Sequence, residues 1–413
     1  MRNSGFIWVI VFVLLALDLY IFQVLKLVSQ SLSPKLRLVL FGAYWAVAIL
    51  AVLVFIFLPN LQSEQWPKSL RTYLVAIIIG LFFAKLISSM FFVVDDLRRG
   101  TTWIASRFSG SSSLQSAENG ITRSAFLSWL GLAAGSTLFG TLVYGFTNKY
   151  NYNVKKLKLA FENLPGAFKG MKILHISDIH AGSFTDHQAV RKGIEKILHQ
   201  QADIILFTGD LVNDRAVEMD EFKKLFAKLD APMGVYSVLG NHDYGDYYRW
   251  ESDRVKMDNL ESLKGVHAEM GWRLLMNEHV VLEKDGHQIA LLGIENWSAK
   301  GNFPKYGKLP DAYAGADKYP FKILMSHDPS HWDGEVRERY GDIDLMLSGH
   351  THGMQFGVEI PGFRWSPVQY MYRQWAGLYE SGKQKLYVNR GFGFIGYPGR
   401  VGILPEITVI ELV

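Results

Sequence analysis

The 413 residues exceed the length of one average domain and carry a formal net charge of +4. The sequence has no cysteine, which excludes disulfide bonds, thiolate metal sites and a cysteine nucleophile without selecting a compartment. Residues 1–150 hold 12 Lys or Arg and 5 Asp or Glu, residues 151–413 hold 31 and 34, and all 12 histidines lie beyond residue 170. The first part is therefore apolar and poor in reactive side chains, whereas the second has the composition of a domain in water.

Four apolar runs occupy the first part, at about residues 5–25, 38–58, 73–94 and 125–146. As helices they would each be roughly 30 Å long, enough to cross the hydrocarbon core of a bilayer. Buried helices of a soluble protein are the alternative, but four consecutive runs with short polar links favour a membrane. We predict an N-terminal four-helix transmembrane bundle over residues 1–150, and hence a multi-pass protein of the cell membrane.

Two charged residues, Asp18 and Lys85, lie inside these runs. A charge at the bilayer centre costs about 2.5–3.5 kcal/mol on insertion scales, which favours pairing or a polar cavity. We predict an ion pair between two helices. A transport or lipid-sensing role and snorkelling toward the interface are the alternatives.

The basic residues of the polar links predict an orientation for the second domain. The first and third links carry most of them: Lys35, Arg37, Arg98, Arg99, Arg107 and Arg123. Because basic loops stay in the cytoplasm, this places the second domain outside it, although lysines after the last run oppose that placement. The positive balance lies beside apolar segments, so we expect phospholipid headgroups as partners and no nucleic acid. Protein partners are not indicated.

From Met171 onward, short β-branched runs that end in polar clusters alternate with helical stretches, which is typical of an α/β domain. Lys172–Ser177 is a predicted strand, and His187–His199 is a predicted helix capped by Thr185 or Asp186. Further predicted strands are Asp203–Thr208, Gly234–Leu239, Gln288–Gly293, Phe321–Ser326, Ile343–Ser348, Leu386–Asn389 and Glu406–Leu412.

Residue types that bind metals follow these predicted strands. They are Asp178, His180, Asp210, Asn241, His242, His327, His350 and His352. Open α/β sheets build their sites at this edge, and Gly209, Gly240 and Gly349 would let the backbone approach closely there. A lone histidine at a strand end is usually structural, but five groups that repeat the arrangement indicate a metal site.

Five strings carry a resemblance to a known family: ISDIH (176–180), TGDLV (208–212), LGNHD (239–243), LMSHD (324–328) and LSGHTHG (347–353). In order and spacing they resemble the calcineurin-like metallophosphoesterase superfamily, over roughly residues 170–412. Residues 387–408 also resemble its bacterial membrane-associated YkuE-type branch. The resemblance implies two mixed β-sheets sandwiched by helices in a domain over residues 151–413.

The resemblance also implies a role for each candidate residue. The first metal would be held by Asp178, His180 and His352, the second by Asn241, His327 and His350, with Asp210 bridging both and His242 as catalytic acid. No ligand position departs from the family pattern, although Met354 stands where the family often has a second glycine.

The residue types agree with this chemistry on their own. Four imidazoles, two carboxylates and one amide suit Mn²⁺, Fe or Zn²⁺ better than Ca²⁺. We expect two divalent ions, with manganese as the first choice. Their +4 exceeds the −2 of two aspartates, so a hydroxide and a phosphoryl group can bind between them.

The remaining polar candidates have less specific signals. His175 lies inside a predicted strand and favours packing or support of a ligand, and His331 is a candidate for the pocket rim. Arg400 is either a substrate-phosphate ligand or an ordinary surface arginine. The other histidines have positions typical of surfaces or helices: His187, His199, His267, His279 and His287.

Three aromatic inserts, Tyr244–Arg254, Trp297–Tyr319 and Phe356–Tyr379, follow the ligand-bearing turns. They would rim a pocket for a lipid or sugar, or stabilise their own loops. The expected function is a membrane-anchored, two-metal phosphoesterase that acts on a phosphodiester or pyrophosphate of a lipid-linked or cell-envelope substrate, including a UDP-2,3-diacylglucosamine type. The rival is a non-enzymatic membrane protein, either a transporter or a metal-dependent scaffold. The complete ligand set disfavours the scaffold.

Overall fold

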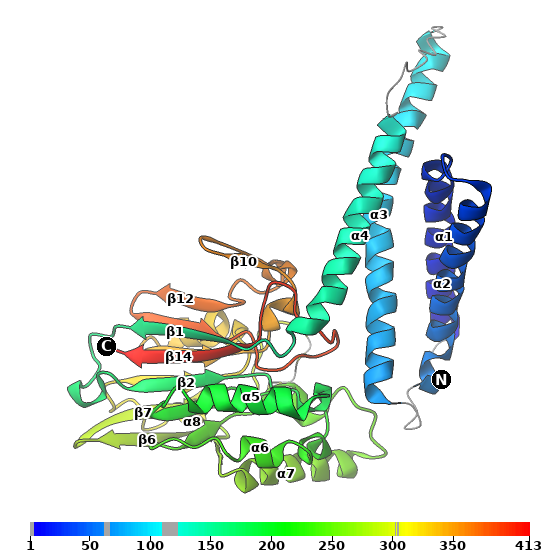
Figure 1. Cartoon of the computed structure of the whole chain (residues 1–413). Helices are drawn as coiled ribbons and strands as arrows, with labels where there is room; N and C mark the ends of the chain where they lie inside the picture. Colours follow the sequence, from blue (N-terminus) through cyan, green and yellow to red (C-terminus); the bar gives the residue numbers. More distant parts are fainter. Residues whose placement is uncertain (1–3, 62–66, 110–122, 302, 304) are drawn as a thin grey trace. The chain divides into compact units, whose positions relative to one another are not determined.

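The computed structural model describes residues 4–61, 67–109, 123–301, 303 and 305–413 (Figure 1). The chain divides into two compact units, Met1–Tyr144 and Gly145–Val413. The boundary at residue 150 between the transmembrane and the catalytic domain stays a prediction.

Four helices of the described residues are long and apolar enough to cross a membrane. They are α1 (Ser4–Val28), α2 (Pro34–Leu61), α3 (Lys68–Ser109) and α4 (Arg123–Gly145). Each contains one of the four apolar runs, so the four predicted helices are confirmed.

Helix α3 is much longer than the run that predicted it. Its 42 residues include Arg98, Arg99 and Arg107, for which the apolar pattern predicts a polar link between helices. Asp95 and Arg98 form an ion pair of 2.8 Å one turn apart on this helix. Such pairs let a helix continue after its apolar part ends. An apolar run therefore predicts only the part of a helix that crosses lipid, and not where the helix ends.

The predicted pair of Asp18 and Lys85 is confirmed, with 2.5 Å between Nζ and Oδ1. The hydroxyl of Tyr44 donates to the same carboxylate oxygen at 2.8 Å. Asp18 is buried. The two charges therefore neutralise each other within the helix bundle, where an unpaired charge would be costly.

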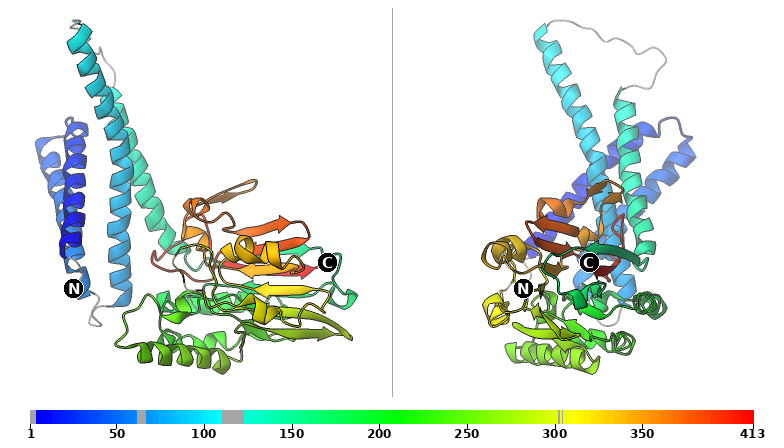
Figure 2. Two further views of the ribbon diagram at one scale, coloured as in Figure 1. Left: turned by 180° about the vertical axis from the view of Figure 1, so that it is seen from behind. Right: turned by 90° about the vertical axis from the view of Figure 1, so that its left-hand side faces the viewer.

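Two six-stranded sheets form the second unit, and both are mixed, as expected (Figure 2). The first contains, in spatial order, β1 (Asn153–Leu159), β14 (Glu406–Leu412), β2 (Lys172–Ile176), β3 (Ile204–Phe207), β4 (Val235–Ser237) and β5 (Arg273–Leu274). The second contains β12 (Gly377–Ser381), β13 (Gln384–Val388), β9 (Leu345–Ser348), β8 (Lys322–Met325), β7 (His287–Gly293) and β6 (Glu278–Lys284). A separate hairpin pairs β10 (Val358–Ile360) with β11 (Phe363–Trp365).

Helices accompany both sheets. They are α5 (His187–Leu198), α6 (Lys223–Phe226), α7 (Asp253–Glu269), α8 (Leu309–Tyr313) and α9 (Arg337–Arg339). The side chain of Asp186 caps α5 by accepting from the backbone N–H of Ala189, so the second of the two predicted caps is the one used.

Alternation along the strands explains the layers. In β2, Ile173 belongs to the core between the sheets, together with Leu291 and Ile323 of the second sheet. The next residue, Leu174, belongs to another core with Ile194 of α5. Successive strand residues face opposite sides, so each sheet buries both of its faces. A third core lies where α8 and the π-helical turn Trp332–Val336 cover the second sheet.

Candidate metal centre

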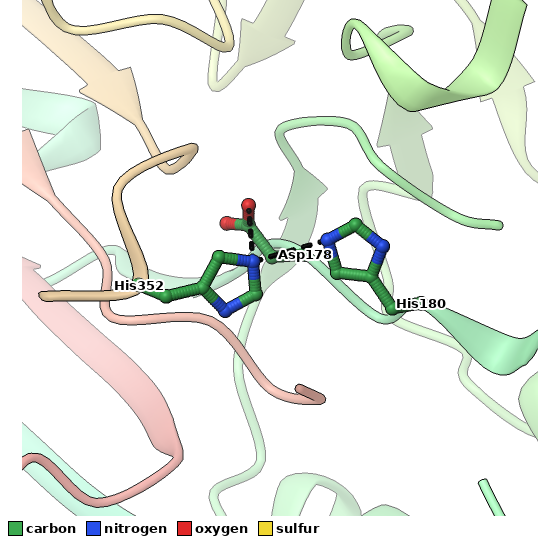
Figure 3. A group of neighbouring side chains, drawn as sticks. All are labelled: Asp178, His180 and His352. Atoms are coloured by element: carbon green, nitrogen blue, oxygen red, sulfur yellow. Dashed lines mark hydrogen bonds and ion pairs between the residues drawn. The ribbon is translucent and has the colours of Figure 1, made fainter. Parts of the chain in front are cut away.

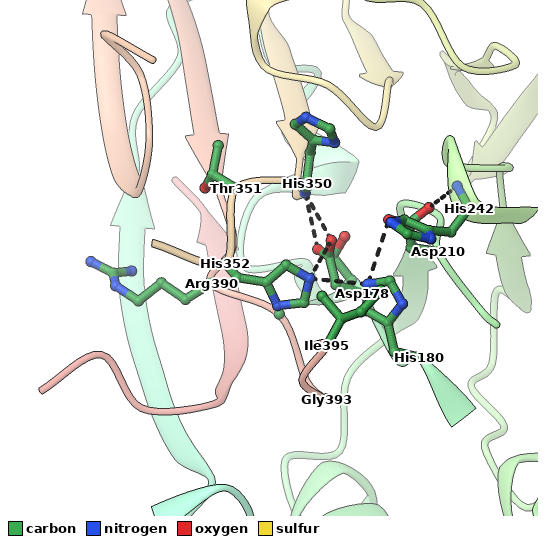
Figure 4. Close-up of polar contacts among 12 residues, drawn as sticks. Asp178, His180, Asp210, His242, His350, Thr351, His352, Arg390, Gly393 and Ile395 are labelled. Carbon is green, nitrogen blue, oxygen red and sulfur yellow. Dashed lines mark hydrogen bonds and ion pairs between the residues drawn. The ribbon is translucent and has the colours of Figure 1, made fainter. Parts of the chain in front are cut away.

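The loops that carry the candidate ligands begin where buried parallel strands end. Strands β2, β3 and β4 are parallel in the first sheet, and β8 and β9 are parallel in the second. Their carboxyl ends bring the predicted residues together in one place (Figure 4). The clustering expected from the sequence is therefore present.

Five of these residues have backbone conformations that only glycine adopts readily. The φ angles are 52° at Asp178, 49° at His180, 61° at Asp210, 72° at His350 and 51° at His352. A left-handed residue other than glycine costs on the order of 1–3 kcal/mol and persists where the surroundings enforce it, often at functional sites.

Glycines make the close approach of these loops possible. A Cβ on Gly349 would collide with the side chain of Ser177 and with the carboxylate of Asp178. On Gly240 it would collide with the carboxylate of Asp210. The expected close approach of the backbone at both glycines is confirmed, because neither position has room for a side chain.

Asp178, His180 and His352 form the first group of candidate ligands, and all three are buried (Figure 3). The Nε2 atoms of the two histidines lie 3.0 Å apart. The Nε2 of His352 also lies 3.3 Å from Oδ1 of Asp178. Three atoms that can donate an electron pair thus converge on one point.

The second group combines Asp210, His327 and His350. Nε2 of His327 lies 3.2 Å from Oδ2 of Asp210 and 3.3 Å from Nδ1 of His350. Oδ1 of Asn241 lies 2.8 Å from the same Nδ1. Since Oδ2 of Asp210 is also 3.5 Å from Nε2 of His180, this carboxylate lies between the two groups.

Hydrogen bonds on the outer side fix which ring atom faces the centre. Nδ1 of His327 lies 2.7 Å from the carbonyl of Thr208, which can only accept, so this nitrogen donates and Nε2 is the ring atom that faces the centre. His350 is held from its other side, because its Nε2 lies 2.9 Å from the hydroxyl of Tyr372. Ring nitrogens and carboxylate oxygens that face one another at about 3 Å repel unless a cation or proton lies between them. This donor set fits two transition-metal cations.

The electrostatics of the two groups agree with this fit. Burial lowers the pKa of His180 to about 3, so the imidazole is neutral, as a ligand must be. Burial raises the pKa of Asp178 to about 6, and the nearby Asp210 charge adds to the rise. Although burial opposes it, the charge of Asp210 raises the pKa of His327, and His327 lowers the pKa of Asp210. A proton on His327 thus supplies positive charge where a metal would.

His242 lies beside both groups and belongs to neither. Its Nδ1 lies 2.8 Å from the carbonyl of Asn213 and must carry a proton, and its backbone N–H donates to Asp210 at 2.8 Å. The imidazole packs against the rings of His180 and Tyr247, with centroid distances of 4.9 and 4.5 Å. Nε2 is the ring nitrogen left for chemistry.

Asp243 is a buried residue that is not among the predicted site residues, although it is the last letter of one of the five strings. Its carboxylate accepts from the backbone N–H groups of Gly240, Asp210, Leu211 and Val212, at 2.8 to 3.2 Å. It therefore joins the loop after β3 to the loop after β4. Burial raises its pKa to about 7.

Arg400 is fully buried, so the surface alternative considered for it is wrong. Its guanidinium donates to the carbonyls of Arg390 at 2.7 Å and His352 at 3.2 Å. These bonds hold the turn that carries His352, and a contact with substrate stays a prediction. His331, considered for the rim, is also fully buried, between Ser326 and Glu335.

His175 packs inside β2 as predicted, with Nε2 2.8 Å from the hydroxyl of Thr208. His267 lies in α7 and is fully buried, with Nδ1 3.0 Å from the hydroxyl of Ser237. The backbone carbonyl of Thr208 accepts from Nδ1 of the candidate ligand His327, so Thr208 links His175 to the metal-binding groups.

Two family models match the chain. One, described as calcineurin-like phosphoesterase, matches residues 171–354, and one described as the transmembrane domain of a probable calcineurin-like phosphoesterase matches residues 1–149. The metallophosphoesterase YkuE of Bacillus subtilis is 30% identical over 253 residues, which are 60% of this chain and 81% of that protein. The phosphodiesterase YaeI of Escherichia coli is 29% identical over 59% of this chain and 82% of that protein.

A transmembrane protein with metallophosphoesterase domain from Danio rerio is 28% identical over 65% of this chain and 60% of that protein. The family uses a dinuclear metal centre, and the two groups of ligand-type side chains match that requirement. The matched regions include both the apolar helices and the five motif strings. The chain belongs to the calcineurin-like metallophosphoesterases and is a membrane-anchored hydrolase of that family.

Proposed function

We propose that this chain hydrolyses a phosphodiester or pyrophosphate of a lipid-linked or cell-envelope substrate with two divalent metals, manganese being the first choice. The first metal would be held by Asp178, His180 and His352, and the second by Asn241, His327 and His350. The observation that carries the proposal is the position of Asp210, whose Oδ2 lies 3.5 Å from His180 and 3.2 Å from His327, one residue of each group. A carboxylate there can bridge two cations.

When bound, two such metals polarise the phosphoryl oxygens and lower the pKa of a water molecule. The chain contributes the proton for the leaving group. His242 is the proposed general acid, because its Nδ1–H is fixed on the carbonyl of Asn213, and Nε2 of the doubly protonated ring would give its proton to the leaving oxygen. A positioned general acid typically contributes about 10²–10⁴-fold to the rate.

A neighbouring tyrosine orients one of the proposed ligands. The amide nitrogen of Asn241 donates to the hydroxyl of Tyr247 at 2.9 Å, which leaves the amide oxygen directed at Nδ1 of His350. Oxygen is the amide atom that binds a hard or borderline cation. The half-exposed ring of Tyr247 also packs on His242, so it lies where a substrate would enter.

The membrane part supports a substrate that is anchored to, or lies near, the lipid. The basic residues that follow the first and third apolar runs motivate placing the catalytic unit outside the cytoplasm, which favours an envelope phosphodiester over a nucleotide-linked precursor. Alkaline-phosphatase and fluorescent-protein fusions at the C-terminus would test the placement. Fluorescence without phosphatase activity would reverse it.

The alternative function, that of a transporter, is less favoured. Asp18 and Lys85 form an ion pair of 2.5 Å, so neither has an unpaired charge that could bind a transported ion. The direct test is hydrolysis of a chromogenic phosphodiester by the purified full chain, with and without added Mn²⁺.

The matched variants for this test are Asp210→Asn and, as a control, Asp220→Asn at an exposed position. We expect the first to lose both metals and activity together, because it removes one of two carboxylates that face four positive charges. The second should keep both. A native protein without metal-dependent turnover, or an Asp210→Asn variant that retains both metals, would contradict the proposal.

A further inference from the structure

The hairpin of β10 and β11 carries an unusual share of exposed apolar side chains. Val358 is 43% exposed, Ile360 58% and Phe363 54%. Pro361 and Gly362 form its two-residue turn, in which Gly362 has a φ of +79°. Figure 1 labels β10 and draws the hairpin above β12, apart from the strands of the second sheet. We call residues 358–365 the apolar hairpin.

More exposed apolar side chains lie in the same stretch of chain. Tyr370 is 78% exposed, Met371 61% and Met354 52%. Met354 also has a left-handed φ of 55°, a conformation that is unfavourable for residues other than glycine, and its exposed side chain belongs to none of the cores that the described residues form. Single exposed apolar residues are ordinary, but six within residues 354–371 mark an interaction surface.

This surface is joined to the metal centre at both ends. His352, a proposed ligand, lies two residues before Met354. Tyr372, which contacts the proposed ligand His350, directly follows Met371. The apolar hairpin is therefore close in sequence to two loops that carry proposed ligands.

Backbone hydrogen bonds place the root of the hairpin beside the point where the chain leaves the last apolar helix. The carbonyl of Gly145, the last residue of α4, accepts from the N–H of Arg400 at 2.9 Å. The next residue, Val401, accepts from the N–H of Gly357 at 2.9 Å. Gly357 directly precedes β10, so two hydrogen bonds connect the helix end to the hairpin.

From these observations we infer that the apolar hairpin, with Tyr370 and Met371, inserts into the interface of the bilayer that α4 crosses. A phospholipid surface is the occupant that fits best. The root of the hairpin is tied to the membrane exit, the tip is apolar and closed by a turn, and Tyr370 is of the residue type enriched at membrane interfaces. Exposed Lys300 and Arg373 suit anionic headgroups.

The inference deepens the proposed function. Its part about the substrate rests on that proposal, because a metal centre held at the lipid surface would hydrolyse a phosphate ester that lies in the membrane. Contact with lipid can be measured without any turnover. Failure of the contact is therefore distinguishable from failure of the phosphoesterase proposal.

The absence of cysteine makes a clean experiment possible. Phe363→Cys and Ile360→Cys would carry a nitroxide label in the full chain, reconstituted in vesicles of phosphatidylethanolamine and phosphatidylglycerol. Controls are Val217→Cys and Met257→Cys, at positions 55% and 65% exposed that lie outside the hairpin. Collisions with oxygen, which dissolves in lipid, and with a water-soluble nickel complex report the depth of each label.

We expect both hairpin labels about 5–10 Å below the lipid phosphates, the depth of interfacial apolar faces, and both control labels in water. Hairpin labels as accessible to nickel as the controls would overturn the inference. Hairpin labels shielded from both reagents would overturn it as well, because they would indicate a protein partner such as a second copy of this chain.

Discussion

Removal of one hydroxyl, by Tyr372→Phe, tests the second half of the metal centre. The hydroxyl lies 2.9 Å from Nε2 of His350 and donates to Oδ2 of Asp328 at 3.3 Å. Burial raises the pKa of Tyr372, and the Asp328 charge adds to the rise, so the hydroxyl stays protonated and can donate. It thus accepts from the imidazole and donates to the carboxylate, which directs Nδ1 of His350 at the metal.

The expected magnitude follows from these contacts. Without the hydroxyl, the partner of Nε2 of His350 among the described residues is Oδ2 of Asp328, which lies at 3.5 Å. A hydrogen bond that involves a charged group contributes about 1.5–3 kcal/mol. We therefore expect roughly tenfold to hundredfold weaker binding at the second metal site, which is the usual effect of removing a partner of a metal-binding histidine.

The assay is a competition titration of Mn²⁺ between a fluorescent chelator and the full chain in detergent. Tyr370→Phe is the control, since it deletes the same group two residues away at an exposed position. Affinity at the first site, which includes His180, should not change. Unchanged affinity at both sites, or equal loss at both, would refute the reasoning, because the first outcome denies the contact and the second indicates damaged folding.

Three further outcomes are expected. His242→Ala should keep both metals and lose about 10²–10⁴ in kcat, most for alkoxide leaving groups and least for nitrophenolate, as metal analysis beside a leaving-group series would show; equal losses throughout would remove the acid role. Exchanging the charges of Asp18 and Lys85 should restore the folded yield that each single neutral substitution lowers, and a double variant as poor as the worse single one would deny the pair. Burial lowers the pKa of His267 to about 3. In the unfolded chain this imidazole therefore takes up a proton as the pH falls from about 6.5 to 3, while in the folded chain it does not, so the free energy of unfolding falls over that range. Unfolding of His267→Gln should take up as much as one proton fewer than unfolding of the native chain.

The strands that end in candidate ligands could be predicted because each is a short apolar run followed closely by a glycine or an aspartate. Strand β1 could not. Its Lys155, Lys156 and Lys158 looked like charges after a membrane helix, yet β1 is the edge strand of the first sheet, where lysines on the exposed side are common. The hairpin of β10 and β11 could not be predicted either, because strands of three residues are too short to show an alternating sequence pattern.

The candidate site was predictable as a set of residue types, but its support was not. Asp243 accepts four backbone N–H groups whose meeting depends on the fold of two loops. Arginine is a residue type that is mostly exposed, so the sequence does not predict the burial of Arg400. Its burial is explained by the backbone carbonyls that converge on its guanidinium, such as that of Arg390. Sequence patterns identify side chains that bind ligands, whereas backbone acceptors become visible only in the folded chain.

Strand β14 has a consequence for the order in which the protein can be made. It lies between β1 and β2, pairing Glu406 with Asn153 and Thr408 with His175. On the ribosome, the four apolar helices and most of both sheets emerge before residues 406–412. Until then β2 presents an open edge, and contacts between residues so distant in sequence form slowly. The nascent catalytic unit therefore waits, incomplete and prone to wrong strand pairing, beside the translocation machinery, and we expect it to depend on chaperones during that interval.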